Sequence, residues 1–318
     1  MTRFLAKLIG FISLQLAVLS LLMLDYPDTE NSYAAAIIDK HELARTAPGP
    51  RILLTGGSNV AFGIDSQMIH RETGYYPVNL ALSAHVGMDY MLNEVEALAR
   101  PDDVIVASIE YEHFIQDITA FTSLHVLECH PPAASYFSWR QHKKLLDMGL
   151  VFLSRVARAN KKPVLFYRDS FNEYGDVVSH HDEPPTYTGP DEKHEVDADY
   201  MAARIDTLNA FAQRCESRGI RVFYLHPSFA DDALEEFERM GFAELRDALT
   251  DGILVPQLVS IEEAIYPKRL FYDTAYHLTL EGKQQRTRLL VNRLADQIEY
   301  QPAPPIERMA VRPSKTNL

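Results

Sequence analysis

Residues 51–59 of the chain read RILLTGGSN, and this stretch decides the fold. Its apolar part has the length of a buried strand, and two glycines close it so that the backbone can turn tightly. Ser58 would therefore stand where a strand ends and a helix begins. In a sheet of parallel strands, this edge is where ligands bind. Ser58 is the first candidate for a functional residue.

Strands and helices alternate from here to residue 298. Further candidate strands are 77–82, 103–109, 163–167, 220–225 and 252–255, and candidate helices are 88–99, 139–159, 199–218, 231–249 and 281–298. This alternation predicts an α/β domain over residues 51–300, with a mainly parallel sheet between two layers of helices. The segments 115–138 and 168–197 interrupt it, and we expect both to be surface insertions near the site.

Polar residues end several of these strands. They are Gly56–Asn59, Leu82–His85, Glu110–His113 and His226-Pro227. Because the carboxyl ends of parallel strands share one edge of the sheet, these residues are expected to converge there.

Composition limits the partners. The chain has 318 residues, of which 47% are hydrophobic and 24% charged, as in ordinary globular proteins. Its net charge of -13 and the lack of a dense Lys/Arg run argue against a nucleic-acid partner. Cys129 and Cys215 lie in no metal-binding pattern, so a disulfide and two buried thiols both remain open.

Residues 1–24 predict a signal anchor. Arg3 and Lys7 precede the uncharged run 8–24, which approaches the minimum length of a transmembrane helix. The positive residues place the N-terminus in the cytoplasm. A cleaved signal peptide and a buried N-terminal helix are the alternatives. In the first two cases the domain lies outside the cytoplasm, after a polar linker over 25–50, and residues 301–318 form a disordered tail.

A second informative stretch, residues 271–282, reads FYDTAYHLTLEG before the last helix. Asp273 and His277 are four residues apart, so a helical turn would bring their side chains together. Thr279 suits the N-cap of the following helix. Serine, histidine and aspartate are the components of an acyl-transfer site, which is recognised by geometry rather than by chain order.

Together these blocks resemble the SGNH (GDSL-like) hydrolase and acyltransferase superfamily. The resemblance implies that Ser58 is the nucleophile, His277 the general base and Asp273 its orienting acid. The segment 78–83, VNLALS, is similar to the second block of that superfamily, with Ala81 in place of a glycine whose backbone N–H binds the oxyanion.

The chain departs from the superfamily in its third block. The family has Gly-x-Asn-Asp there, whereas residues 108–113 read SIEYEH and contain no asparagine. A carboxylate such as Glu110 cannot donate a hydrogen bond unless it is protonated. Asn59, Asn79 and His113 are the other candidates for oxyanion or substrate binding. The acid–histidine spacing is four residues instead of three.

The resemblance implies a serine-dependent esterase or O-acyltransferase that acts on acyl esters of a cell-surface or exported polysaccharide. Its expected location is the periplasm or the outer face of the cytoplasmic membrane. The N-terminal helix is expected to contact the bilayer. A membrane protein that donates the acyl group is a further candidate partner. The alternative is a non-catalytic, membrane-tethered polysaccharide-binding or assembly protein on the same fold.

The motifs require neither a cofactor nor a metal. The remaining histidines and acids, His180-His181, Asp182, His194 and Glu195, lack the rigid spacing of a metal site and are interpreted as a solvated loop. Arg204, Arg214 and Arg218 are interpreted as solvated charges on a helix surface.

Overall fold

A computed structural model describes residues 30–156, 166–189, 197–234 and 242–299, with a few positions before residue 16. The predicted anchor over 1–24, the tail over 301–318, and His194 and Glu195 lie largely or wholly outside these ranges. Within them, no helix has both the length and the apolar character needed to cross a membrane.

The centre of the domain is a four-stranded sheet in which all neighbours are parallel. Its order is β2-β1-β3-β4, formed by β1 (Arg51–Gly56), β2 (Tyr76–Asn79), β3 (Val104–Ser108) and β4 (Arg221–Tyr224). The predicted parallel α/β fold is therefore confirmed. The chain moves outward from β1 to β2 and then crosses back to β3. The resulting switch point lies between the carboxyl ends of β1 and β3, where such sheets bind ligands.

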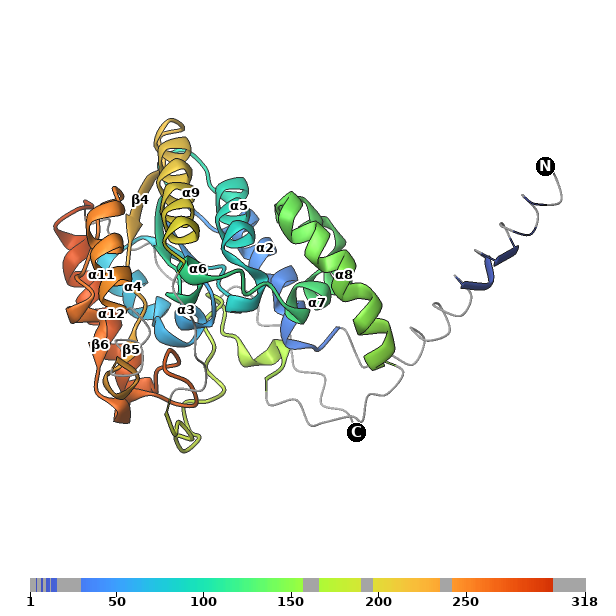
Figure 1. Ribbon diagram of the computed structural model, residues 1–318. Helices are drawn as coiled ribbons and strands as arrows, with labels where there is room; N and C mark the ends of the chain where they lie inside the picture. Colours follow the sequence, from blue (N-terminus) through green and yellow to red (C-terminus); the bar gives the residue numbers. More distant parts are fainter. Residues whose placement is uncertain are drawn as a thin grey trace.

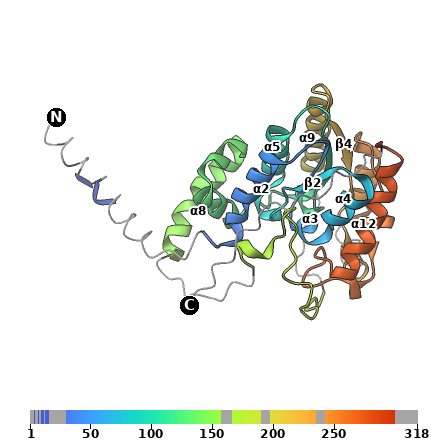
Figure 2. The ribbon, with the colours of Figure 1, turned by 180° about the vertical axis from the view of Figure 1, so that it is seen from behind.

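Helices cover both faces of the sheet, as Figures 1 and 2 show from opposite sides. Alternate strand residues divide between two cores. Leu53, Ile105 and Val222 belong to the core that includes α2 (Ala36–Thr46), α5 (Met88–Leu98) and α9 (Ala198–Glu216). Ile52, Val106 and Phe223 belong to the core that includes α3 (Ser58–Gly63), α4 (Ser66–Thr73) and α12 (Leu280–Ala295).

The predicted insertion 115–138 is mostly helical. It contains the end of α6 (Glu112–Ile115), α7 (Phe121–Cys129) and a 3₁₀ turn over Pro131–Tyr136. The next helix is α8 (Trp139–Val156), which lies at the edge of the molecule opposite α11 (Phe242–Gly252) and α12 in both views (Figures 1 and 2).

Two other sequence predictions differ from the structure. Part of the expected linker over 25–50 forms a 3₁₀ turn (Tyr33–Ala35) and α2, because its small apolar residues pack into the core. Residues 252–255 form no strand. Ile253 and Val255 are buried by packing, and within the described residues the sheet continues beyond β4 only as a single parallel bridge between Tyr224 and Gln257.

The remaining differences are small. The expected helix over 231–249 is described as helix at 231–234 and in α11, and the residues between lie outside the described ranges. A short parallel pair, β5 (Phe229–Ala230) and β6 (Ile265–Tyr266), follows the main sheet.

Candidate active site

Ser58 begins α3 directly after β1, and Gly57 is the N-cap of this helix. A Cβ added to Gly57 would lie 2.3 Å from Glu110 Oε1 and 2.6 Å from Ala84 N and Cα. Only glycine fits at this position for that reason. The segments that follow β1, β2 and β3 thus meet at the turn that carries Ser58.

Asp273 and His277 form a pair in which His277 Nδ1 lies 2.7 Å from Asp273 Oδ1. The sequence predicted that a helical turn would bring the two residues together, but they do not share one. They lie in a loop closed by an antiparallel bridge between Phe271 and Leu278 and by the hydrogen bond from Tyr272 N–H to His277 O. The carboxylate engages Nδ1 and leaves Nε2 as the nitrogen available for proton transfer.

Phe62 brings this pair to α3. Its ring stacks on the His277 imidazole with centroids 4.1 Å apart and planes 7° from parallel. Phe62 and Ser58 are four residues apart on α3 and therefore lie on the same side of it. Among the described residues, no hydrogen bond joins Ser58 Oγ to His277, and such contacts often tighten only when substrate binds.

Glu110 supports the turn rather than facing substrate. Its buried carboxylate accepts hydrogen bonds from Gly57 N–H at 3.2 Å and Asn59 N–H at 3.1 Å. A negative charge at this position caps the first turn of α3. The N–H of Ser58, between these two, has no hydrogen-bond partner within the described part of the chain.

Asn59 is held on the opposite side by Arg286 of α12. Arg286 Nη1 donates to Asn59 O at 2.8 Å and Nη2 donates to Asn59 Oδ1 at 3.0 Å, while Asn59 Nδ2 donates to Ser108 O. Burial lowers the pKa of Arg286 to about 10. Because these bonds occupy the Asn59 amide, its structural role is to fix α3 against β3.

Asn79 and Ala81 are likewise engaged inside the loop after β2. Ala81 N–H donates to Asn79 Oδ1 at 3.1 Å, and Asn79 Nδ2 donates to Asp176 Oδ1 at 2.8 Å. The backbone of this loop that approaches the turn belongs instead to Ala84, three residues farther along, which lies against Gly57. No hydrogen bond from Ala84 N–H occurs among the residues that the structure describes. The sequence did not single out Ala84, because the path of the loop depends on its packing.

His113 lies behind Glu110, with its Nε2 3.7 Å from Glu110 Oε2. Burial, with a smaller contribution from Arg204, lowers the pKa of His113 to about 3, so the imidazole is neutral near pH 7. The 3.7 Å between His113 Nε2 and Glu110 Oε2 is longer than a hydrogen bond. His113 therefore contacts the surroundings of the turn and also lines a separate pocket.

Sequence reasoning missed two aromatic residues near the pair. Tyr33, from the expected linker, donates its hydroxyl to Leu82 O at 2.7 Å, and burial and the charge of Asp273 raise its pKa. His180 was interpreted as part of a solvated loop, which is wrong. Its Nε2 lies 2.9 Å from Leu278 O, its ring lies 4.9 Å from that of Phe62, and burial lowers its pKa to about 4.

No group of three or more His, Cys, Asp or Glu residues in the described ranges is placed to hold a metal ion. Cys129 and Cys215 form no disulfide in the described part of the chain. No protein-family model matches the chain, and no curated protein matches it significantly.

The geometry can support one kind of chemistry. A serine hydroxyl on a strand-to-helix turn, an oriented imidazole nearby and unengaged backbone N–H groups are the parts of a nucleophilic acyl-transfer site. Glu110 and Arg286 hold the turn from two sides.

Proposed function

We propose that this protein is a serine-dependent acyl-ester enzyme of the SGNH type, an esterase or an O-acyltransferase. The observation that carries the proposal is the Asp273–His277 hydrogen bond, together with the stacking of His277 on Phe62 one turn after Ser58. These contacts bring residues more than two hundred positions apart to the end of β1.

In the proposed reaction, His277 Nε2 accepts the proton of Ser58 as the hydroxyl oxygen attacks the ester carbonyl. The N–H groups of Ser58 and Ala84 stabilise the oxyanion, and Asp273 stabilises the imidazolium. Collapse of the tetrahedral intermediate breaks the bond to the alkoxide oxygen, which takes the proton from His277 and leaves as the alcohol. Water or a sugar hydroxyl then attacks the acyl-enzyme, which makes the protein a hydrolase or a transferase, respectively.

We also propose that the substrate is an acylated cell-surface or exported polysaccharide and that the predicted N-terminal helix anchors the domain outside the cytoplasm. Both proposals rest on the sequence resemblance and on the uncharged run over residues 8–24.

A second candidate function is a non-catalytic polysaccharide-binding or assembly protein. It is favoured by the missing third-block asparagine and by the lack of a Ser58–His277 hydrogen bond among the described residues. Polysaccharide binding that survives Ser58→Ala, without turnover of any acyl ester, would support this alternative.

An ester-cleavage assay with an activated acetyl ester, run with and without polysaccharide as acceptor, distinguishes the two candidate functions. The enzyme proposal predicts turnover or a burst that Ser58→Ala abolishes. Ser135→Ala, in the exposed part of the 3₁₀ turn after α7, is the matched control and should keep full activity. Equal rates in wild type and Ser58→Ala would reject Ser58 as the nucleophile.

A further inference from the structure

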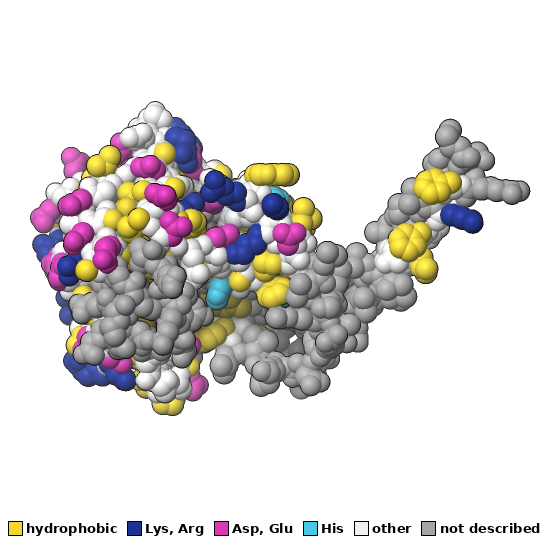
Figure 3. Space-filling view, in the orientation of Figure 1, with side chains coloured by type: hydrophobic (Ala, Val, Ile, Leu, Met, Phe, Trp, Pro, Cys, Tyr) yellow, Lys and Arg dark blue, Asp and Glu magenta, His cyan; other side chains and the backbone are white. Residues whose placement is uncertain are grey.

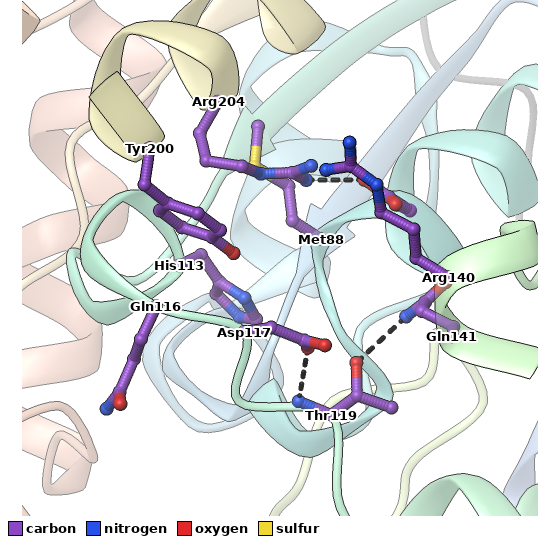
Figure 4. A pocket seen from close by; sticks show the side chains of 10 residues that line it. Met88, His113, Gln116, Asp117, Thr119, Arg140, Gln141, Tyr200 and Arg204 are labelled. Atoms are coloured by element: carbon purple, nitrogen blue, oxygen red, sulfur yellow. Dashed lines mark hydrogen bonds and ion pairs between the residues drawn. The ribbon is translucent and has the colours of Figure 1, made fainter. Parts of the chain in front are cut away.

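A small polar pocket lies beside the candidate site, between α6, α8 and α9 (Figure 4). Its volume is about 50 Å³. About 10–15 Å³ of such space is enough for one water molecule, so the pocket has room for a few water-sized groups, such as those of a carboxylate. Its lining includes His113, Thr119, Arg140, Gln141, Tyr200 and Arg204.

Two arginines dominate the chemistry of this pocket. Arg140 from α8 and Arg204 from α9 extend toward each other from opposite sides (Figure 4). Arg204 forms an ion pair with Asp89, and its side chain is only 12% exposed, so the solvated position expected from the sequence is wrong. Arg140 has no ion pair among the described residues, which leaves this side of the pocket with a net positive charge.

The second acid of the lining does not offset that charge. Asp117 already accepts a hydrogen bond from Thr119 N–H and lies 3.4 Å from Lys144 Nζ. Burial alone would raise the pKa of Asp117, but hydrogen bonds from Thr119 and the positive charge of Lys144 together lower it. On the face shown in Figure 3, several Lys and Arg side chains lie near α8, and others lie at the opposite edge of the domain among acidic side chains.

Two buried nitrogen atoms in the lining lack partners. Arg204 Nε and His113 Nε2 have no hydrogen-bond partner in the described part of the chain. His113 is almost fully buried, and an unsatisfied buried polar group costs about 1–3 kcal/mol. An oxygen-rich anion in the pocket would satisfy the Arg204 donor, and guanidinium groups match a carboxylate in geometry and charge.

The pocket shares its walls with the Ser58 turn. On one side, His113 Nε2 lies 3.7 Å from the Glu110 carboxylate that caps α3. On the other, Gln141 Nε2 donates to Val86 O at 2.8 Å, in the short loop that also carries Ala84. A ligand group bound in this pocket would therefore contact side chains that also contact the loop and the Glu110 carboxylate at the Ser58 turn.

We propose that this pocket binds the carboxylate of an acidic sugar, so that the substrate polysaccharide contains uronic acid residues. The inference rests on the proposed function, because it assigns the substrate class of the same site. Arg140 and Arg204 recognise the carboxylate, beside the loop and the buried Glu110 that also form the Ser58 turn.

The test measures binding rather than turnover, so it is independent of the chemistry at Ser58. Glucuronate, glucose and acetate are titrated against the full chain by saturation-transfer NMR, in the wild type and in Ser58→Ala. We expect glucuronate to bind at least tenfold more tightly than glucose, to bind more tightly than acetate, and to bind Ser58→Ala unchanged. Retained binding with no ester turnover would reject the enzyme proposal while keeping the pocket.

Arg140→Gln is the decisive variant, because Arg140 is exposed and its replacement should leave the fold intact. We expect it to weaken glucuronate binding about tenfold, whereas Lys143→Gln, an exposed cation on the same helix outside the lining, should have no effect. Equal effects of the two variants, or equal binding of glucuronate and glucose, would overturn the proposal. Acetate binding as tight as that of glucuronate would show a site for free carboxylates and overturn the sugar assignment.

Discussion

The Phe62 ring lies face to face with the His277 imidazole, with centroids 4.1 Å apart and planes 7° from parallel. This contact joins α3, which begins at Ser58, to the loop that carries the acid–histidine pair. Asp273 fixes one edge of the imidazole and Phe62 covers one face, so two contacts define the orientation of the ring. The approach of His277 to the nucleophile therefore depends on Phe62 as well as on Asp273.

Phe62→Leu tests this dependence. Leucine keeps the buried position apolar but removes the flat surface that supports the imidazole. We expect a loss of kcat of about tenfold with little change in KM, because orientation of a catalytic group affects the chemical step more than substrate binding. Steady-state kinetics on an acetyl ester measure kcat and KM separately. A kcat equal to that of the wild type would show that Asp273 alone orients His277.

Glu110→Ala should damage stability and activity together. It leaves the N–H groups of Gly57 and Asn59 without an acceptor in a buried turn, at a cost of about 3 kcal/mol in the free energy of unfolding. Urea denaturation measures the loss. Glu110→Gln, which keeps one carbonyl acceptor, should be intermediate, and Glu42→Ala at an exposed ion pair should be neutral. A Glu110→Ala variant as stable as Glu42→Ala would contradict the capping role.

Gly57→Ala should displace the turn because the added methyl group would overlap Glu110 and the backbone of Ala84. We expect a lower melting temperature and loss of ester cleavage. Gly49→Ala is the matched control, since a Cβ at that position has open space around it. Retention of full activity by Gly57→Ala would mean that the three loops do not meet as closely as described.

Stability should fall as the solution is acidified from about pH 6.5 to 4. Burial lowers the pKa of His180 and His226 to about 4 and that of His113 to about 3. In this range the unfolded chain binds more protons than the folded protein, so acid favours unfolding. Each histidine contributes up to about 1.4 kcal/mol per pH unit.

Urea denaturation at pH 5 and pH 7 checks this trend. Because carboxylates also begin to titrate near pH 5, His226→Gln isolates one histidine, and its slope of stability against pH should be smaller than that of the wild type. An unchanged slope would mean that His226 is protonated in the folded protein too.

The sequence was sufficient for the four strands of the main sheet because they are short apolar runs closed by glycine or polar residues, but it also predicted a strand over 252–255 that does not form. It was not sufficient for α2, whose polar residues suggested a linker while Ala36, Ile37 and Ala44 pack inward. Asp273 and His277 were found through their spacing, although a loop rather than a helix brings them together. Spacing constrains which side chains can meet but leaves the backbone path open.

The supporting residues of the site were harder to predict. Arg286 lies on a helix rich in charged residues, and nothing local distinguishes it from an exposed arginine. Its contact with Asn59 spans 227 residues along the chain. Glu110 was considered as a substrate ligand, but its role follows from two backbone N–H groups whose positions depend on the tertiary fold. Such roles arise from packing and hydrogen bonding between distant segments.

The most direct test of the central claim is labelling of the full chain with a fluorophosphonate, which reacts with a serine activated by a histidine. Peptide mapping by mass spectrometry then locates the adduct. We predict a single adduct on Ser58, absent from Ser58→Ala and formed at least a hundredfold more slowly in Asp273→Asn. An unlabelled wild type, an adduct on another serine, or equal rates in wild type and Asp273→Asn would contradict an active site built from Ser58, His277 and Asp273.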